Sequence, residues 1–203
     1  MNIRNEKWGT LEEILDTVWR MLERGAATSR DPFHWPALGT ATNNGCSLRT
    51  VILRHVDSRQ RTVVCHTDAR APKVGEIKEQ PTAGWLFYHP EKRVQVRLSG
   101  RAALHDNDPF ADRQWADASL TSRLNYCASK PPGTPIGKPS SGLPDFLLKK
   151  VPTLVQTEMG RKHFMAIAMK IDAIDWLMLK VSGNRRARFE WGNDKFHATW
   201  LVP

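Results

Sequence analysis

The spacing of apolar residues changes near residue 37, and this change constrains the fold more than any other feature of the sequence. Between residues 11 and 22 the apolar side chains recur at helical spacing, whereas from Ala37 onward they alternate with polar ones in short runs separated by turn sequences. Period two is the pattern of half-buried β-strands, and many short strands with such turns usually form a barrel or a sandwich. The sequence therefore predicts a mainly β, antiparallel fold with added helices.

The N-terminal segment, residues 1–30, is predicted to hold one amphipathic helix. Its apolar positions are Leu11, Ile14, Leu15, Val18, Trp19 and Leu22. Thr10 and Glu13 have the spacing of a capping box, and Gly25 is expected to end the helix. Because a helix with one apolar face needs a surface to cover, we expect it to dock on the β-fold.

The strands are expected in two groups. The first is predicted as an antiparallel meander made of the runs ALGTAT, CSLRTVILRHV, TVVCHT, AGWLFYH and VQVRLSGRAAL. Asn43-Asn44-Gly45 and the sequence PEKR supply turns within it, and KVGEIKEQ is predicted as a short helix that Pro81 ends. The second group consists of MAIAMKIDAIDWLML, RRARFEW and FHATWLVP, with turns at residues 182–184 and 192–194.

Residues 108–158 interrupt the strands and are predicted to form a helical and Pro/Gly-rich insertion. Asp108 is a plausible helix cap with Pro109 at the first helical position, and the run KPPGTPIGKPSSGLP is too rich in Pro, Gly and Ser for regular structure. A loop of this length is either a plain connection or a lid or partner-spanning arm. We expect the whole chain, residues 1–203, to form one domain.

Composition restricts the class of protein and its partners. Hydrophobic residues make up 40% of the 203 residues and charged residues 25%, which is typical of a globular chain. The 30 Lys and Arg against 21 Asp and Glu give a net charge of +9, which suits nucleic acid, an acidic surface or a phosphorylated small molecule. The charge alone does not choose among these partners.

The cysteines, histidines and N-terminal residues lead to three further expectations. Cys46, Cys65 and Cys127 are scattered and odd in number, so we expect reduced thiols. The seven histidines show no metal-ligand spacing, so no metal is predicted. The first residues lack the apolar core of a signal peptide, and no run approaches the roughly 18 apolar residues of a membrane span. We therefore expect a cytoplasmic protein without membrane contact.

Basic residues recur at the margins of the predicted strands. In VQVRLSG, alternation places Gln95, Arg97 and Ser99 on one face, so that this face is polar and cationic. Arg49 and Arg54 are separated by an odd number of residues and would lie on opposite faces of a regular strand. One of them must therefore lie at a strand end, or a bulge must turn it.

Four motifs in order and spacing resemble the pyridoxamine 5'-phosphate oxidase family, closest to its oxidase-related, flavin-binding branch. They are RTVILR at 49–54, HTDARAPK at 66–73, RVQVRLSG at 93–100 and RARF at 186–189, and the similarity runs from about Ala37 to the C-terminus. The resemblance implies an FMN-binding split β-barrel that forms a homodimer with FMN at the subunit interface. It also implies an oxidoreductase that passes hydride between a small anionic substrate and FMN.

The resemblance also assigns residues to the site. The cofactor-binding positions that it implies are Arg49, Thr50, Val51, Ile52, His66, Thr67, Arg70, Lys73, Gln95 and Arg188. The substrate-binding positions are Arg54 and Arg186, and no catalytic residue is assigned. A phosphate monoester carries nearly two negative charges and binds guanidinium groups through charge-assisted bonds, so Arg49, Arg70 and Lys73 suit the phosphate.

Two departures from the family pattern bear on this assignment. Ala71-Pro72-Lys73 stands where the family has S-R-K, so a hydroxyl and a cation are missing unless Arg70 replaces the lost charge. The closing motif R-x-H-x-R of the true oxidases reads Asn184, Arg186 and Arg188 here, which affects the substrate side. An alternative function is a non-enzymatic split-barrel module for flavin, haem or another anionic ligand. Nucleic-acid binding, a third hypothesis based on charge, is not expected.

Overall fold

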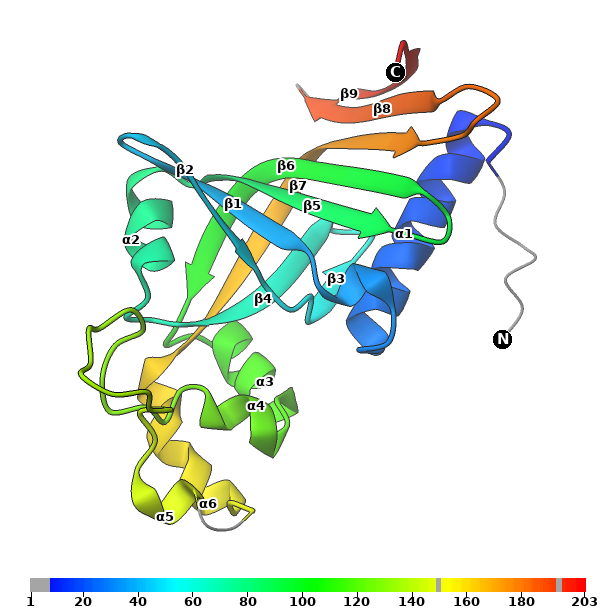
Figure 1. Ribbon diagram of the computed structural model, residues 1–203. Helices are drawn as coiled ribbons and strands as arrows, with labels where there is room; N and C mark the ends of the chain where they lie inside the picture. The colour runs from blue at the N-terminus through cyan, green and yellow to red at the C-terminus, as the bar shows by residue number, and fades with distance from the viewer. Residues whose placement is uncertain (1–7, 149–150, 193–194) are drawn as a thin grey trace.

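The computed structural model describes residues 8–148, 151–192 and 195–203, and its ribbon is drawn in Figure 1. Nine strands form one antiparallel sheet, in the order β2-β1-β5-β6-β7-β4-β3, with β8 added to β7 and β9 to β8. The bounds are β1 Ala37–Thr42, β2 Gly45–Thr50, β3 His55–Asp57, β4 Thr62–Asp68, β5 Thr82–His89, β6 Val94–His105, β7 Phe164–Met178, β8 Arg185–Gly192 and β9 Lys195–Leu201. The predicted mainly β, antiparallel fold with added helices is confirmed.

The prediction of a simple meander is wrong. β1 pairs with β5 and β4 pairs with β7, so neighbours in the sheet are often distant in sequence. The long strand β7 makes this possible, because it pairs with β6 along its length, with β4 over its first half and with β8 over its second half. Of the turn predicted at residues 192–194, Asn193 and Asp194 lie outside the described residues.

The run CSLRTVILRHV is divided between two strands instead of forming one. β2 ends at Thr50 and β3 begins at His55, and the link between them is held by bonds from Val51 N to Pro36 O (2.9 Å) and from Leu53 N to His34 O (3.0 Å). The chain here leaves the β1 side of the sheet and joins β4, where Arg54 N donates to Val64 O at 2.8 Å. The odd spacing of the two arginines is explained by this break.

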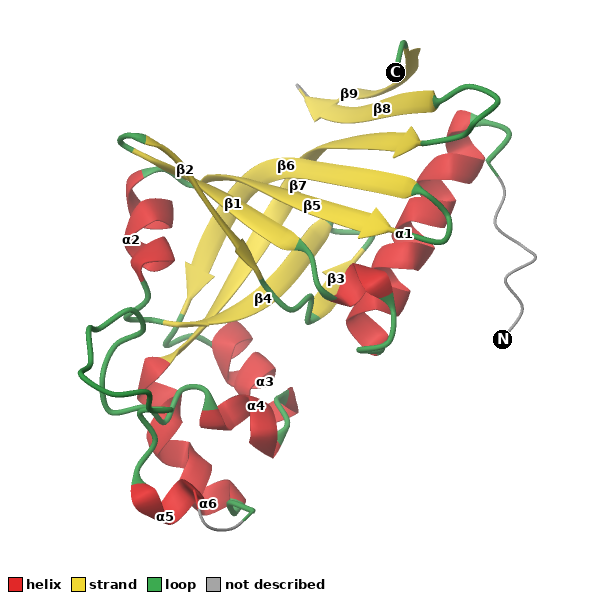
Figure 2. Cartoon of the chain, viewed as in Figure 1, coloured by secondary structure: helices red, strands yellow, loops and turns green. Residues whose placement is uncertain are grey.

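Helix α1, Leu11–Ala27, packs its apolar face on the sheet, as predicted (Figure 2). The Thr10 hydroxyl accepts a bond from Glu13 N and the Glu13 carboxylate accepts one from Thr10 N, which is the expected capping box. The helix does not end at Gly25. A Cβ there would lie 2.7 Å from Phe33 Cβ, so glycine serves a close contact between the helix and η2, Pro32–His34.

The insertion lies beyond one end of the sheet in Figures 1 and 2. It contains α3 Pro109–Asp117, α4 Leu120–Leu124, α5 Asp145–Leu148, α6 Leu154–Thr157 and η3 Glu158–His163. Asp108 caps α3 as predicted, but the helical segment breaks at Ala118 because Ser119 caps a new helix. Residues 130–144 have no helix or strand, as expected from their composition.

Two apolar cores hold these parts together. The main core joins α1 to the sheet and contains the fully buried Trp85, Trp176 and Phe87. A smaller core joins the insertion to β4 and β7 through Trp115, Tyr126 and Phe164. Helix α2, Pro72–Glu79, follows β4, and its residues Val74 and Ile77 are buried. Among the described residues no helix is long and apolar enough to cross a membrane.

Candidate functional site

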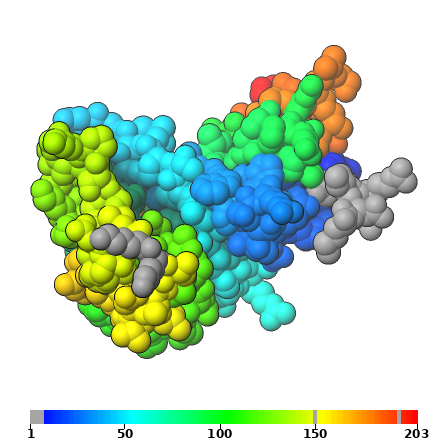
Figure 3. Space-filling view, turned by 60° about the horizontal axis from the view of Figure 1, so that its bottom comes forward, coloured from blue at the N-terminus to red at the C-terminus, as the bar shows by residue number. Residues whose placement is uncertain are grey.

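A cavity of about 290 Å³ lies between the β2–β3 link, the end of β4, the start of α2 and the insertion. Figure 3 shows a hollow between the yellow-green insertion and the blue and cyan strands. The lining residues are Thr50, Val51, Ile52, Arg54, His66, Thr67, Asp68, Lys73, Asn125, Tyr126 and Pro132. Seven of the predicted site residues therefore line one cavity, although they come from three separate stretches of chain.

Arg54 and His66 have buried polar atoms without a partner in this cavity. The Arg54 Nε and the His66 Nδ1 make no hydrogen bond to the described residues, although Arg54 Nη2 donates to Ser122 Oγ at 3.1 Å. Burial lowers the pKa of His66 to about 4, so its ring is neutral near pH 7. If Nε2–H donates to Gln114 Oε1, at 3.0 Å, then Nδ1 is an acceptor. Such unpaired groups fit a ligand that has both an acceptor and a donor.

Lys73 lines the cavity, and Arg49 is near enough to act on it electrostatically. The Lys73 Nζ donates to Thr67 Oγ1 at 3.0 Å, and burial, followed by the charge of Arg49, lowers the pKa of Lys73. Arg49 itself lies outside the lining. Its guanidinium donates to Ser47 Oγ at 2.6 Å, to the Thr40 hydroxyl and to Glu76 Oε2 at 2.8 Å. Arg49 is thus electrostatically coupled to the cavity but is held by residues beside it.

Arg70 points toward the insertion and does not line the cavity. Its Nε and Nη2 donate to the two oxygens of Asp68 at 2.9 and 2.7 Å, and Nη2 also donates to Ala128 O at 3.0 Å. The bonds that Arg70 donates to Asp68 raise the pKa of Arg70. Arg70 therefore ties the insertion to the end of β4.

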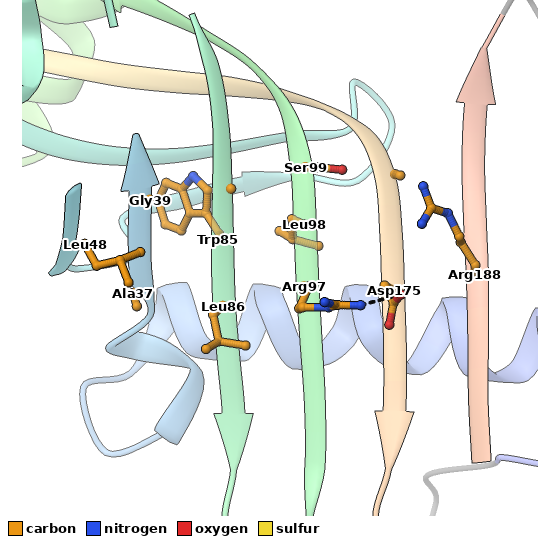
Figure 4. A pocket seen from close by; sticks show the side chains of 12 residues that line it. Ala37, Gly39, Leu48, Trp85, Leu86, Arg97, Leu98, Ser99, Asp175 and Arg188 are labelled. Atoms are coloured by element: carbon orange, nitrogen blue, oxygen red, sulfur yellow. Dashed lines mark hydrogen bonds and ion pairs between the residues drawn. The ribbon is translucent and has the colours of Figure 1, made fainter. Parts of the chain in front are cut away.

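Gln95, Arg186 and Arg188 lie on β6 and β8, away from this cavity. Arg188 lines a second, more apolar cavity of about 440 Å³ on the face formed by β1, β5, β6, β7 and β8, shown in Figure 4. Gln95 is half-buried opposite Tyr88 of β5 and Leu177 of β7. The described chain therefore separates the predicted site residues into two groups.

Asp175 links two arginines at the second cavity. Its Oδ2 accepts bonds from Arg97 Nη2 and Arg186 Nη2, both at 2.8 Å. Burial alone would raise the pKa of Asp175, but the bonds from Arg186 and Arg97 outweigh it and lower that pKa. Arg188 pairs with Glu190 at 2.8 Å, while its buried Nε has no partner among the described residues. This face therefore combines apolar lining residues with arginines that are held in place by carboxylates.

Sequence reasoning missed Asp68 and the three lining residues of the insertion. Asn125, Tyr126 and Pro132 belong to no motif, and only the Pro/Gly-rich composition nearby indicated a functional loop. Tyr126 is placed by the aromatic contacts with Trp115 and Phe164, at centroid distances of 5.9 and 5.1 Å. In the described parts of the chain, no group of three or more His, Cys, Asp or Glu is arranged to hold a metal ion.

Part of the chain is similar in sequence to proteins of a known family. Residues 16–106 match the family model described as pyridoxamine 5'-phosphate oxidase, FMN-binding domain. A pyridoxine/pyridoxamine 5'-phosphate oxidase of Ruegeria sp. is 33% identical over 95 residues, which are 46% of each chain. The one of Burkholderia ambifaria is 35% identical over 94 residues, 46% of this chain and 42% of that protein. The match thus spans less than half of these relatives.

Two solved structures share the fold over nearly the whole chain. A pyridoxamine 5'-phosphate oxidase-related, FMN-binding protein of Nostoc punctiforme superposes with a TM-score of 0.72 at 20% identity, covering 93% of this chain and 96% of the other. PhzG of Burkholderia lata, solved in complex with tetrahydrophenazine-1-carboxylic acid, gives a TM-score of 0.73 at 19% identity, covering 98% of both chains. At such identities the likeness concerns the fold alone.

Proposed function

We propose that this chain is an FMN-dependent oxidoreductase acting on a small anionic substrate, because residues 16–106 match the family model of the FMN-binding domain of pyridoxamine 5'-phosphate oxidase. The observation that carries the proposal is the cavity in which Arg54 and His66 keep buried, unpaired polar atoms beside the cation Lys73. Bound FMN would supply hydride transfer, while the protein binds, orients and desolvates the reactants.

The residues present fit the parts of FMN. Lys73 and the neighbouring Arg49 would bind the phosphate, since charge-assisted bonds to a dianion are among the strong ones. The link at residues 50–52 and Thr67 would contact the ribityl chain and ring edge. The lining contains two cations, Lys73 and Arg54, and position 72, where the family has an arginine, is Pro72. With Arg54 assigned to the substrate, phosphate binding would depend on Lys73 and the neighbouring Arg49.

A second copy of the chain would complete the site. The cavity of about 290 Å³ is at the lower limit for small-molecule sites, so a flavin would extend beyond it. Gln95 and Arg188, which the family resemblance also assigns to FMN, lie on another face of the same chain. A homodimer in which this face meets the partner's cavity would bring both groups of residues to one flavin.

The substrate is proposed as a small anion bound near Arg54. The unpaired Nε of Arg54 would donate to its anionic group. The curated relatives act on pyridoxine or pyridoxamine 5'-phosphate by name, and the PhzG neighbour was solved with tetrahydrophenazine-1-carboxylic acid. Both classes are candidates, because Arg186 is held by Asp175 and stands where true oxidases have a histidine.

The absorbance spectrum of the purified protein tests the cofactor first. A flavin band at about 450 nm, with FMN identified by mass in the released ligand, is expected. A colourless protein that does not bind added FMN would overturn the proposal. Reduction of the bound flavin by pyridoxamine 5'-phosphate or by a tetrahydrophenazine carboxylic acid would then identify an enzyme. The alternative is a flavin-binding module without turnover, which the bonds between Arg186 and Asp175 favour.

A further inference from the structure

Glu76 of helix α2, Arg49 and Thr40 are all hydrogen-bonded to one another. Glu76 Oε2 accepts a bond from Thr40 Oγ1 at 2.5 Å and one from Arg49 Nη2 at 2.8 Å, and the Thr40 hydroxyl also accepts a bond from Arg49. The side chains of Arg49 and Glu76 are 20% and 18% exposed. Most of the donors of Arg49 are therefore engaged within the chain by an anion and two hydroxyls.

The same carboxylate is electrostatically coupled to Lys73. Lys73 and Glu76 are three positions apart on α2, so they lie on the same side of the helix. Burial is the main cause that lowers the pKa of Lys73, Arg49 lowers it further, and Glu76 acts in the opposite direction. Burial tends to raise the pKa of Glu76, but bonds from Thr40 and Arg49 outweigh this and lower it. Glu76 is therefore a full negative charge among the cations that a phosphate would use.

We propose that Glu76 competes with a bound phosphate for Arg49 and so limits the affinity of the site for FMN; this inference rests on the proposed FMN site. Arg49 must exchange its bond to Glu76 for one to the phosphate, or share its donors between two anions. Either arrangement leaves Glu76 near a dianion and opposes binding. A dianionic group can displace the carboxylate, whereas an uncharged ligand gains nothing from Arg49.

Substitution of Glu76 by glutamine tests this directly. Glu76→Gln retains an oxygen acceptor for Thr40 and Arg49 but removes the charge, so FMN should bind about 5- to 20-fold more tightly. Riboflavin, which lacks the phosphate, should bind wild type and variant equally. The matched control is Glu79→Gln, which removes a carboxylate from the exposed side of the same helix and should leave both affinities unchanged.

Flavin titrations by fluorescence and thermal melts of the flavin-free proteins give the readouts. A second variant, Glu76→Ala, covers the case in which the glutamine amide still holds Arg49, and it should also tighten FMN. Weaker FMN binding in a folded Glu76→Gln would show that the carboxylate orients Arg49 for the phosphate, and unchanged binding would show no coupling; either overturns the inference alone. Wild-type protein that binds no FMN would overturn the proposed function, and this inference with it.

Discussion

Arg49 and Arg54 lie on either side of the irregular link between β2 and β3, and their contacts differ. Arg54 has an unpaired Nε in the cavity, whereas Arg49 is bound to Glu76, Thr40 and Ser47 beside it. Removal of Arg49 would therefore weaken the binding of the FMN phosphate and lower the stability of the fold. Removal of Arg54 would affect the substrate side of the cavity.

We expect Arg49→Ala to weaken FMN binding about 10- to 150-fold, since a charge-assisted contact contributes about 1.5 to 3 kcal/mol. The flavin-free variant should also be less stable, because Glu76 loses its cation. Arg54→Ala should retain FMN and lower kcat/KM for an anionic substrate. Flavin titration, thermal melts and steady-state kinetics measure the three effects. Equal FMN affinity in Arg49→Ala and wild type would contradict the assignment of Arg49.

His66 should make stability depend on pH. Burial lowers its pKa from 6.5 to about 4 in the folded protein, so as the pH falls the unfolded chain takes up the proton first. The stability that comes from keeping His66 neutral is fully present above a pH of about 6.5, and it is lost progressively as the pH falls toward about 4. Between pH of about 7 and about 5 this residue should cost about 2 kcal/mol of unfolding free energy. Urea unfolding measures the free energy of unfolding at both pH values. The change between them should be smaller in His66→Gln than in wild type, and an equal change would contradict the prediction.

At the scale of elements, the insertion is joined to the β-fold by a polar tie as well as by its aromatic core. Arg70 donates to Asp68 at the end of β4 and to Ala128 O in the insertion. Asn125, Tyr126 and Pro132, which line the cavity, lie close in sequence to this tie. The insertion thereby forms a wall of the site, and Arg70 positions that wall.

Arg70→Met should loosen this wall. The variant leaves Asp68, whose side chain is 5% exposed, without its guanidinium partner, so we expect a loss of about 2 kcal/mol of unfolding free energy. Chymotrypsin should cleave faster after Phe146, which is 54% exposed in the insertion, and FMN should bind a few-fold more weakly. The control is Arg113→Met, an exposed arginine of α3. Cleavage at the wild-type rate would show that the aromatic core alone holds the insertion.

Some features of these elements could be predicted from the sequence, and others could not. Alternation in VQVRLSG predicted the buried and exposed residues of β6, because burial there follows the local pleat. The break after Thr50 was not predicted, since β-branched residues continue through it and only the odd arginine spacing indicated it. The positions of Arg49 and Arg70 depend on Glu76 and Asp68, partners whose side chains no local pattern specifies. The motifs thus predicted most of the residues that line the cavity, but they did not predict which carboxylates pair with the arginines beside it.

At the scale of the whole molecule, one face of the sheet is exposed and apolar. Leu48, Leu86 and Tyr88 are 70%, 42% and 46% exposed, and the first two line the cavity that also contains Arg188 (Figure 4). Exposed apolar groups that surround anchored cations are typical of protein interfaces. The proposed homodimer would cover this face, and Arg188 would then find a partner for its buried Nε.

Leu48→Lys should therefore weaken both the dimer and FMN binding. A lysine in a buried interface must lose its hydration, so sedimentation should show a shift toward monomer at concentrations where the wild type is dimeric. FMN affinity should fall at least about 10-fold, although Leu48 does not line the flavin cavity, because the partner's residues are lost with the dimer. Val181→Lys, at a site that is 98% exposed in the β7–β8 turn, is the matched control. A wild-type monomer that binds one FMN per chain would show that a single copy suffices, and the separation of Gln95 and Arg188 from the cavity would then exclude them from the cofactor site.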